Sequence, residues 1–198
     1  MNQTPWNRIV KTTAAVSEPV SLGRVKRSLG LDNVIDYDTT LQELIASASQ
    51  AVSNDLGRAL TTTTYTLYLQ RWPGRIIELP YPPLIAVDSI KYYADSDSPL
   101  TTFSSYTVAK EGAPGLIALN EDASWPDLMD RGVNPIEIQF QAGYGADTDD
   151  VPPAIQAAVT MTAAYFFEQP LPVVVGTTAA ELPLSVSRLI NSERFERY

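Results

Sequence analysis

Carboxylates are the side chains of this sequence best suited to chemistry, because it has no imidazole and no thiol. The 198 residues include no histidine and no cysteine. Their absence removes the common general base, the Ser-His and Cys-His dyads, and imidazole or thiolate ligands for a metal ion. The reactions that remain open use a pair of carboxylates, as glycosidases do, or carboxylates that hold a divalent cation.

The densest acidic group is Asp147, Asp149 and Asp150, which precedes the sequence Val151-Pro152-Pro153. A helix is expected to begin here, because proline is tolerated in a first turn where its missing N–H would be unpaired anyway. Acidic side chains at such a place cap backbone N–H groups and interact favourably with the positive end of the helix dipole. We therefore favour capping over cation binding for this group.

A second acidic group lies between residues 120 and 135, a stretch too long for a tight hairpin. We expect an exposed loop here, with room for a turn of helix. Its acids lack the flanking strand-end pattern of a catalytic pair, which favours solvated side chains over a catalytic site. These acids are Glu121, Asp122, Asp127 and Asp130. We assign no catalytic, metal-binding or cofactor-binding residue and expect a protein that is not an enzyme and carries no cofactor.

Two further patterns could suggest ligand binding. Gly143-Tyr144-Gly145 lacks the third glycine of a dinucleotide fingerprint and the lysine of a P-loop, so it indicates a turn. Aromatic residues could form a platform that stacks sugars or single-stranded nucleic acid. Tyrosines in strands more often pack in cores and at edges, and few basic residues accompany these ones. The aromatic residues are Tyr65, Tyr68, Trp72, Tyr81, Tyr92 and Tyr93.

Charge is distributed unevenly along the chain. The net charge of −9 argues against a protein that wraps nucleic acid. Residues 1–30 carry five basic side chains against Glu18 alone, whereas residues 111–150 carry nine acidic ones against Arg131 alone. This asymmetry has two interpretations. It is ordinary solvated surface, or it has a function, as complementary charged faces that steer assembly or as an acidic wall past which DNA slides.

The basic residues of the first part of the chain fall on one predicted helix. Ser21 is a suitable N-cap and Gly30 a suitable C-terminal stop for a short helix with Leu22, Val25 and Leu29 on its apolar face. Its polar face carries Arg24, Lys26 and Arg27, which are either solvated or contacts for a neighbouring subunit.

A longer helix is expected to follow and to end at Gly57. Thr40 and Glu43 have the spacing of a capping box, although Asp38 competes as the cap. The apolar stripe of this helix has the width expected for packing on a single core. The stripe comprises Leu41, Leu44, Ile45, Ala48, Val52 and Leu56.

From Thr61 the periodicity changes to two, which is typical of strands with one buried face. The clearest case is Ile136, Ile138 and Phe140, which alternate with polar residues. Prolines fall between the predicted strands, where they remove no hydrogen bonds from a sheet. The predicted strands are residues 63–69, 75–79, 86–93, 105–109, 116–119 and 136–141.

The end of the chain returns to helical patterns. A helix is predicted from Pro153 to Glu168, and Leu182-Pro183-Leu184 opens a last short helical segment that runs through Ile190. No apolar run approaches the roughly 20 residues needed to span a bilayer. The fold class is α+β, a small helical bundle built from both chain ends with an inserted, mainly antiparallel β-lobe. Residues 1–60, 61–148 and 149–198 form the first helical part, the insertion and the closing helices.

The order of these motifs resembles the head-tail connector (adaptor, or head-completion) proteins of tailed bacteriophages. One matching block is the strand that ends at Gly143-Tyr144-Gly145, followed by Val151-Pro152-Pro153-Ala154-Ile155. A second is the proline-rich turn Leu79–Pro83 with the strand up to Tyr93, and a third is the amino-terminal helix pair from Ser21 to about Gly57. The resemblance covers nearly the whole chain, roughly Val20 to Ile190.

The resemblance implies a structural virion protein at the head-tail interface, present in the host cytoplasm during assembly. Its copies would form a ring, commonly dodecameric, that extends the DNA channel between a portal protein and a tail or stopper protein. DNA would pass without sequence-specific binding. The alternative from another class is a carboxylate-dependent glycosidase or a carbohydrate-binding module.

In such families a terminal segment docks on the portal ring. The resemblance therefore makes residues 184–198 the candidate docking segment, although terminal residues are usually frayed. The segment ends in aromatic and arginine residues of the kind favoured at binding hot spots. The docking candidates are Leu184, Arg188, Leu189, Ile190, Arg194, Phe195, Arg197 and Tyr198. The acids of residues 120–135 are candidates for a surface that faces a neighbouring subunit, the lumen or the tail.

Overall fold

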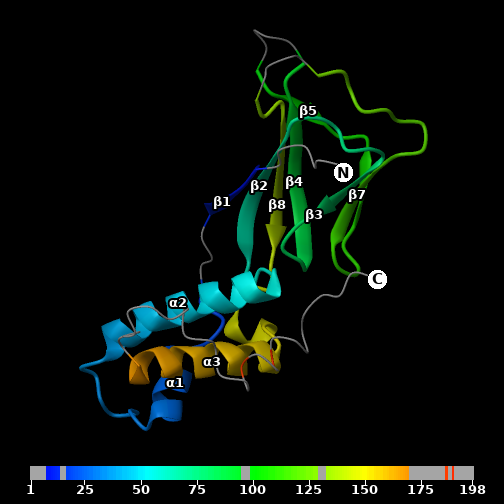
Figure 1. Ribbon diagram of the computed structural model, residues 1–198. Helices are drawn as coiled ribbons and strands as arrows, with labels where there is room; N and C mark the ends of the chain where they lie inside the picture. The colour runs from blue at the N-terminus through cyan, green and yellow to red at the C-terminus, as the bar shows by residue number, and fades with distance from the viewer. Residues whose placement is uncertain are drawn as a thin grey trace, which may run out of the picture. The chain divides into compact units, whose positions relative to one another are not determined.

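The computed structural model describes residues 8–13, 17–94, 99–128 and 133–169, together with Val186 and Leu189. In this part of the chain the fold is α+β, as the sequence predicts, with three helices and antiparallel sheets. The strands are inserted between the second and third helices, apart from one at residues 8–13 that precedes the first helix. Two compact units are present (Figure 1). Of the described residues, 8–13 and Thr62–Gly143 form the sheet unit, and all the others form the helical unit.

The helical unit contains α1 (Leu22–Leu29), α2 (Asp38–Leu56) and α3 (Pro153–Glu168). Helix α3 has the predicted bounds. The predicted ends of α1 are also confirmed, because the Ser21 hydroxyl accepts a hydrogen bond from the Arg24 N–H and Gly30 adopts the left-handed conformation. Gly57 ends α2 in the same way, at φ 64°.

The start of α2 differs from the prediction. The helix begins at Asp38, its N-cap is Tyr37, and the Tyr37 side chain forms no capping hydrogen bond. Thr40 is therefore already inside the helix and cannot be its N-cap. The prediction of a capping box from Thr40 and Glu43 was wrong. The Asp38 carboxylate accepts a hydrogen bond from the Lys26 ammonium of α1 instead of capping its own helix.

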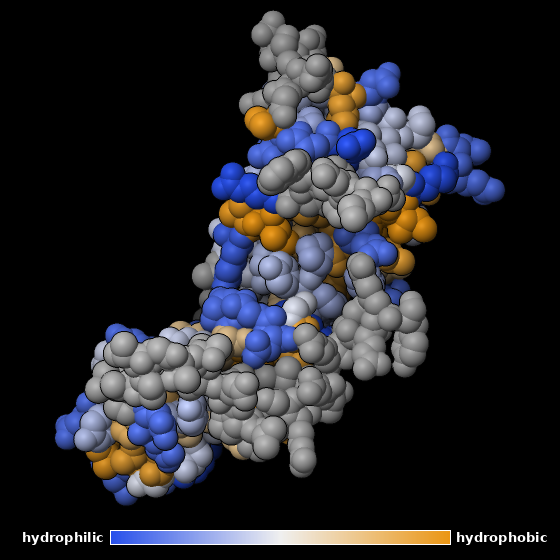
Figure 2. All heavy atoms as spheres, viewed as in Figure 1, coloured by the Kyte–Doolittle hydropathy of each residue, from blue (hydrophilic) through white to orange (hydrophobic). Residues whose placement is uncertain are grey.

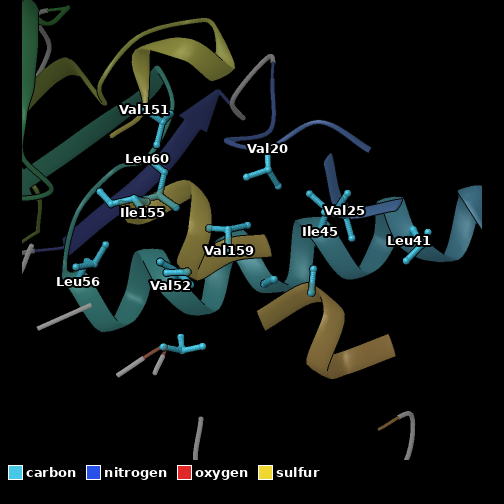
Figure 3. Packing of buried hydrophobic residues seen from close by; sticks show 14 residues of the cluster. Val20, Val25, Leu41, Ile45, Val52, Leu56, Leu60, Val151, Ile155 and Val159 are labelled. Atoms are coloured by element: carbon cyan, nitrogen blue, oxygen red, sulfur yellow. The ribbon is translucent and has the colours of Figure 1, made fainter. Parts of the chain in front are cut away.

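The core of the helical unit is a continuous cluster of aliphatic side chains (Figure 3). Val25 of α1 and most of the predicted stripe of α2 pack together with Ile155 and Val159 of α3. Leu44, which the prediction included, is only half-buried and is not part of the cluster. Val186 is also part of the cluster, with no exposed surface. Since full burial of such a side chain contributes roughly 1.5–3 kcal/mol, this cluster holds the three helices together.

Within its described residues the sheet unit contains eight strands, and all of the strand pairs among them are antiparallel. A five-stranded sheet has the order β1-β2-β8-β4-β5, and a three-stranded sheet has the order β3-β7-β6 (Figure 1). The strands are β1 (Arg8–Thr13), β2 (Thr63–Leu69), β3 (Ile76–Leu79), β4 (Leu84–Tyr92), β5 (Thr101–Phe103), β6 (Tyr106–Ala109), β7 (Gly115–Leu119) and β8 (Ile136–Ala142).

All six predicted strands are present, with ends within two residues of the predicted ones. Strand β8 buries Ile136, Ile138, Phe140 and Ala142 and leaves the residues between them partly exposed, which confirms the alternation in the sequence. The sequence did not indicate β1 and β5. Both are edge strands of the larger sheet with no fully buried face, so they have no alternating pattern.

No helix in the described part of the chain combines the length and the apolar character that a bilayer span requires.

Candidate interaction surfaces

The basic residues of α1 have three different environments. Lys26 lies inside the helical unit, where its Nζ is 2.7 Å from Asp38 Oδ1 and its side chain is 9% exposed. A buried charge is stable only with a partner, so this ion pair fixes the start of α2 against α1. Arg24 is half-buried and Arg27 is exposed. Arg27 is therefore the one residue of the three that is exposed.

Arg24 belongs to a polar network that joins α1 to the start of α3. Its Nη1 donates to Gln156 Oε1 at 2.7 Å. The amide nitrogen of Gln156 donates in turn to the carbonyl oxygens of Thr148 and Val151, each at 2.8 Å. Gln156 is buried, so this network satisfies polar groups that would otherwise be costly.

The acidic group before α3 forms a cap, as expected. The element that it caps is a short 3-10 helix and not α3 itself, whose N-cap is Pro152. Asp147 and Asp150 form a reciprocal capping box around the 3-10 helix η1 (Thr148–Asp150). The Asp147 N–H donates to Asp150 Oδ2 at 3.0 Å. Across the described residues, no three acidic side chains come close enough together to hold a metal ion.

The second acidic group lies on an exposed loop, which we call the acidic loop (residues 120–128). Glu121, Asp122 and Asp127 are exposed, whereas Asp130 lies outside the described residues. The loop contains a turn closed by a hydrogen bond from the Ala123 N–H to the Asn120 carbonyl at 3.1 Å, and no helix.

Arg75 fixes the start of the acidic loop through its backbone. The guanidinium donates to the carbonyl oxygen of Asn120 at 2.9 Å and to that of Glu121 at 3.2 Å. Because the hydrogen bonds go to backbone carbonyls, they hold the turn without neutralising the carboxylates. The loop therefore presents negative charge from a defined conformation.

Two tryptophans, which we call the indole clamp (Trp72 and Trp125), hold the other half of the acidic loop. Their rings are stacked, with centroids 4.3 Å apart and an angle of 6° between the planes. Each indole also donates to the backbone close to the other one, Trp72 Nε1 to Pro126 O at 3.0 Å and Trp125 Nε1 to Gly74 O. The clamp was not predicted, because its two rings are far apart in sequence and no local pattern connects them.

The aromatic residues form two internal clusters rather than one platform. Trp72, Tyr92, Phe103 and Trp125 pack together, and Tyr65 stacks between Tyr81 and Phe140. Burial raises the pKa of Tyr65 above its ordinary value, with a smaller contribution from neighbouring Tyr81. Burial and then the Asp88 carboxylate likewise raise the pKa of Tyr106. Most ring faces are therefore engaged within the protein.

Tyr68 and Tyr93 contribute to a shallow pocket on the polar face of the five-stranded sheet. The pocket has a volume of about 370 Å³ and also contains Arg8, Asn134 and Glu137. Figure 2 shows hydrophilic residues over much of the visible surface, with smaller hydrophobic groups between them. The pocket is open, and its lining combines these polar side chains with Val10 and Val133. Small-molecule sites are typically enclosed and predominantly apolar, so this pocket does not resemble one.

Most of the candidate docking residues at the carboxyl end lie outside the described residues. These are Leu184, Arg188, Ile190, Arg194, Phe195, Arg197 and Tyr198. The two described residues of this segment, Val186 and Leu189, are helical, and both pack on the core of the helical unit. Val186 and Leu189 therefore stabilise the fold.

No family model matches the chain, and no curated protein matches its sequence. Its fold is similar to that of chains in solved structures of gene transfer agent (GTA) particles. One chain, from the neck of an empty GTA particle computed with C6 symmetry, is 23% identical with a TM-score of 0.80, over 96% of this chain and 97% of that one.

Two further structures show the same similarity. A chain from the virion of a native GTA particle is 22% identical with a TM-score of 0.78, over 96% of both chains. A chain from the neck of a native GTA particle computed with C12 symmetry is 24% identical with a TM-score of 0.73, over 96% of this chain and 97% of that one. At these identities the similarity shows a shared fold over almost the full length.

Proposed function

We propose that the protein is a structural subunit of the neck of a phage-like particle, where its copies form a ring at the head-tail junction. The observation that carries this proposal is the shared fold over 96% of the chain with a chain from the neck of an empty GTA particle. The extent of the similarity matters, because it includes both the sheet unit and the helical unit and not one common motif alone.

A ring is the assembly that this proposal requires. The neck structures with similar chains were computed with C6 and C12 symmetry. Cyclic symmetry is built from a head-to-tail contact whose rotation closes, so each copy must carry two different and complementary surfaces. The uneven charge of this chain is compatible with such a pair of surfaces.

In the ring, the proposed partners are a portal protein on one side and a tail or stopper protein on the other. The carboxyl end, from about Asn191 onward, is the proposed portal-docking segment, since Val186 and Leu189 pack on the protein's own core. DNA would pass through the ring without sequence-specific contacts. An acidic chain suits this role, because basic contacts would hold DNA through counterion release.

The mechanism is structural, and no reacting group takes part in it. The sequence has no histidine or cysteine, and Asp147 and Asp150 are engaged in capping, so the proposed role depends on shape and charge. Each subunit would act as a spacer that fits beside its copies and carries the channel from the portal toward the tail.

Electron microscopy and native mass spectrometry of the purified chain test this proposal, alone and mixed with a portal ring. We expect closed rings with six or twelve copies, either free in solution or on the portal. A chain that remains monomeric across the concentration range, both alone and with the portal, would contradict the proposal. Turnover of an oligosaccharide that is lost on neutralising one carboxylate would replace it with the glycosidase alternative.

A further inference from the structure

A basic group lies on one edge of the five-stranded sheet, and an acidic group lies beside the opposite edge. Strand β1 forms one edge and presents the exposed side chains of Arg8 and Lys11. Strand β5 forms the other edge, and four strand spacings separate the two, which is about 19 Å. We call the first edge the basic edge (Arg8–Thr13).

The acidic loop lies beside the second edge. Phe103 of β5 is in contact with both rings of the indole clamp, at centroid distances of 5.0 Å to Trp125 and 6.3 Å to Trp72. The clamp therefore attaches the acidic loop to β5. Three exposed carboxylates lie on this side of the sheet unit, on Glu121, Asp122 and Asp127.

Neither charged group forms a salt bridge with another described residue, although Arg8 lines the same pocket as Glu137 and the Arg75 guanidinium lies on the backbone of the acidic loop. Among the described residues, the ion pair between Lys26 and Asp38 is the one salt bridge, and it lies in the helical unit. Arg8 and Lys11 are three positions apart on a regularly paired part of β1, so they project from opposite faces of the strand. The basic edge thus has one cation on each side of an outer strand edge to which no described strand is paired.

We propose that the basic edge of one copy docks against the acidic loop of the next copy. This inference depends on the proposed ring, and it assigns the acidic loop to a contact between subunits in preference to the lumen or the tail. Two different patches at opposite edges of one sheet are what a head-to-tail contact needs. Arg75 and the indole clamp order the acidic loop before it binds, which lowers the entropic cost of docking.

Electrostatics explains why the contact should use these patches. Two copies with a net charge of −9 each repel on average, so association requires a local region of opposite sign. Complementary charges guide the encounter and select one relative orientation. Exposed pairs are screened over about 8 Å at physiological ionic strength, so the contact should weaken as salt is added.

The test uses two charge-reversal variants. The edge variant is Arg8→Glu with Lys11→Glu, and the loop variant is Glu121→Lys with Asp122→Lys and Asp127→Lys. Each variant alone brings like charges together at every contact between copies. We therefore expect the subunit concentration at which half of the protein is assembled to be at least about tenfold higher than for the wild type. Mixed in equal amounts, the two variants should assemble again, because each reversed patch then finds an opposite charge on its neighbour.

The restored rings should contain the two variants in alternation, and native mass spectrometry would detect this as equal numbers of each. A carbodiimide, which couples an amine to a carboxylate, should also link Lys11 of one wild-type copy to the acidic loop of another. Lys110→Glu, at an exposed residue just after β6, is the matched control and should leave assembly unchanged. Circular dichroism melting checks that every variant is folded.

The outcomes separate this inference from the proposed function. A wild-type chain that never assembles, alone or on a portal, would overturn both. Wild-type rings together with unchanged assembly of both reversal variants would overturn the inference alone. The charges of the basic edge would then be explained by protection of an edge strand from unwanted pairing with other strands. Variants that fail alone and also fail when mixed would equally contradict the proposed pairing of the two patches.

Discussion

At the scale of single residues, the indole clamp offers a direct test of what orders the acidic loop. Trp125→Ala removes the stacked ring and the hydrogen bond to Gly74, and we expect it to lower the free energy of unfolding by about 2 kcal/mol. Urea denaturation followed by circular dichroism measures this loss. Trp125→Phe is the matched control, since it keeps a ring and should lose only about 1 kcal/mol. An alanine variant as stable as the wild type would show that the clamp contributes nothing.

Ionisation of Tyr65 should lower the free energy of unfolding at alkaline pH. It is 9% exposed, and burial raises its pKa above the ordinary value of 10.0. A raised pKa means that the folded state holds the proton more tightly than the unfolded state does. The contribution of protonated Tyr65 to the free energy of unfolding is therefore complete below pH 10, and it is lost as pH rises through the folded-state pKa. Urea midpoints measured from neutral to alkaline pH should fall, and Tyr65→Phe should reduce the fall. An identical pH dependence in the variant would contradict this account.

At the scale of elements, the helix ends provide a pair of substitutions with opposite expected signs. Gly57 ends α2 with φ 64°, a conformation that side chains with a Cβ disfavour, so Gly57→Ala should cost about 1 kcal/mol. Gly23 lies in the first turn of α1, and an added Cβ there would meet only Arg27 Nη1 at 3.6 Å. Gly23→Ala should therefore stabilise the protein slightly, by about 0.5 kcal/mol. Thermal melts of both variants check the signs, and a stabilising Gly57→Ala would refute the capping role.

At the scale of the whole molecule, the carboxyl end combines a structural part with the proposed docking part. Truncation after Pro183 removes Val186, which is fully buried in the core of the helical unit, so it should destabilise the fold as well as affect assembly. Truncation after Asn191 keeps Val186 and Leu189. We expect this shorter deletion to leave the melting temperature within a few degrees of the wild type and to abolish binding to a portal ring.

A pull-down with the portal ring, together with a thermal melt, distinguishes the two deletions. Retained portal binding after truncation at Asn191 would contradict the docking role of the last seven residues. A lowered melting temperature for that variant would instead assign those residues to the fold.

Local patterns in the sequence were sufficient to predict most of the elements. The bounds of α3, the N-cap at Ser21, the ends at Gly30 and Gly57 and the alternation in β8 all follow from residues within a few positions of each other. The same local information favoured capping by Asp147 and Asp150. It could do so because periodicity, caps and turns depend on the geometry of one short stretch of backbone.

Tertiary packing determined the rest, since those features depend on residues that are distant in the chain. Strand β1 exists through its pairing with β2, more than fifty residues later, and Lys26 is buried because Asp38 comes from the next helix. The stacking of Trp72 on Trp125, which orders the acidic loop, likewise has no local signal. The free energy of such contacts depends on which segments meet in space, and no periodicity within a single segment records that.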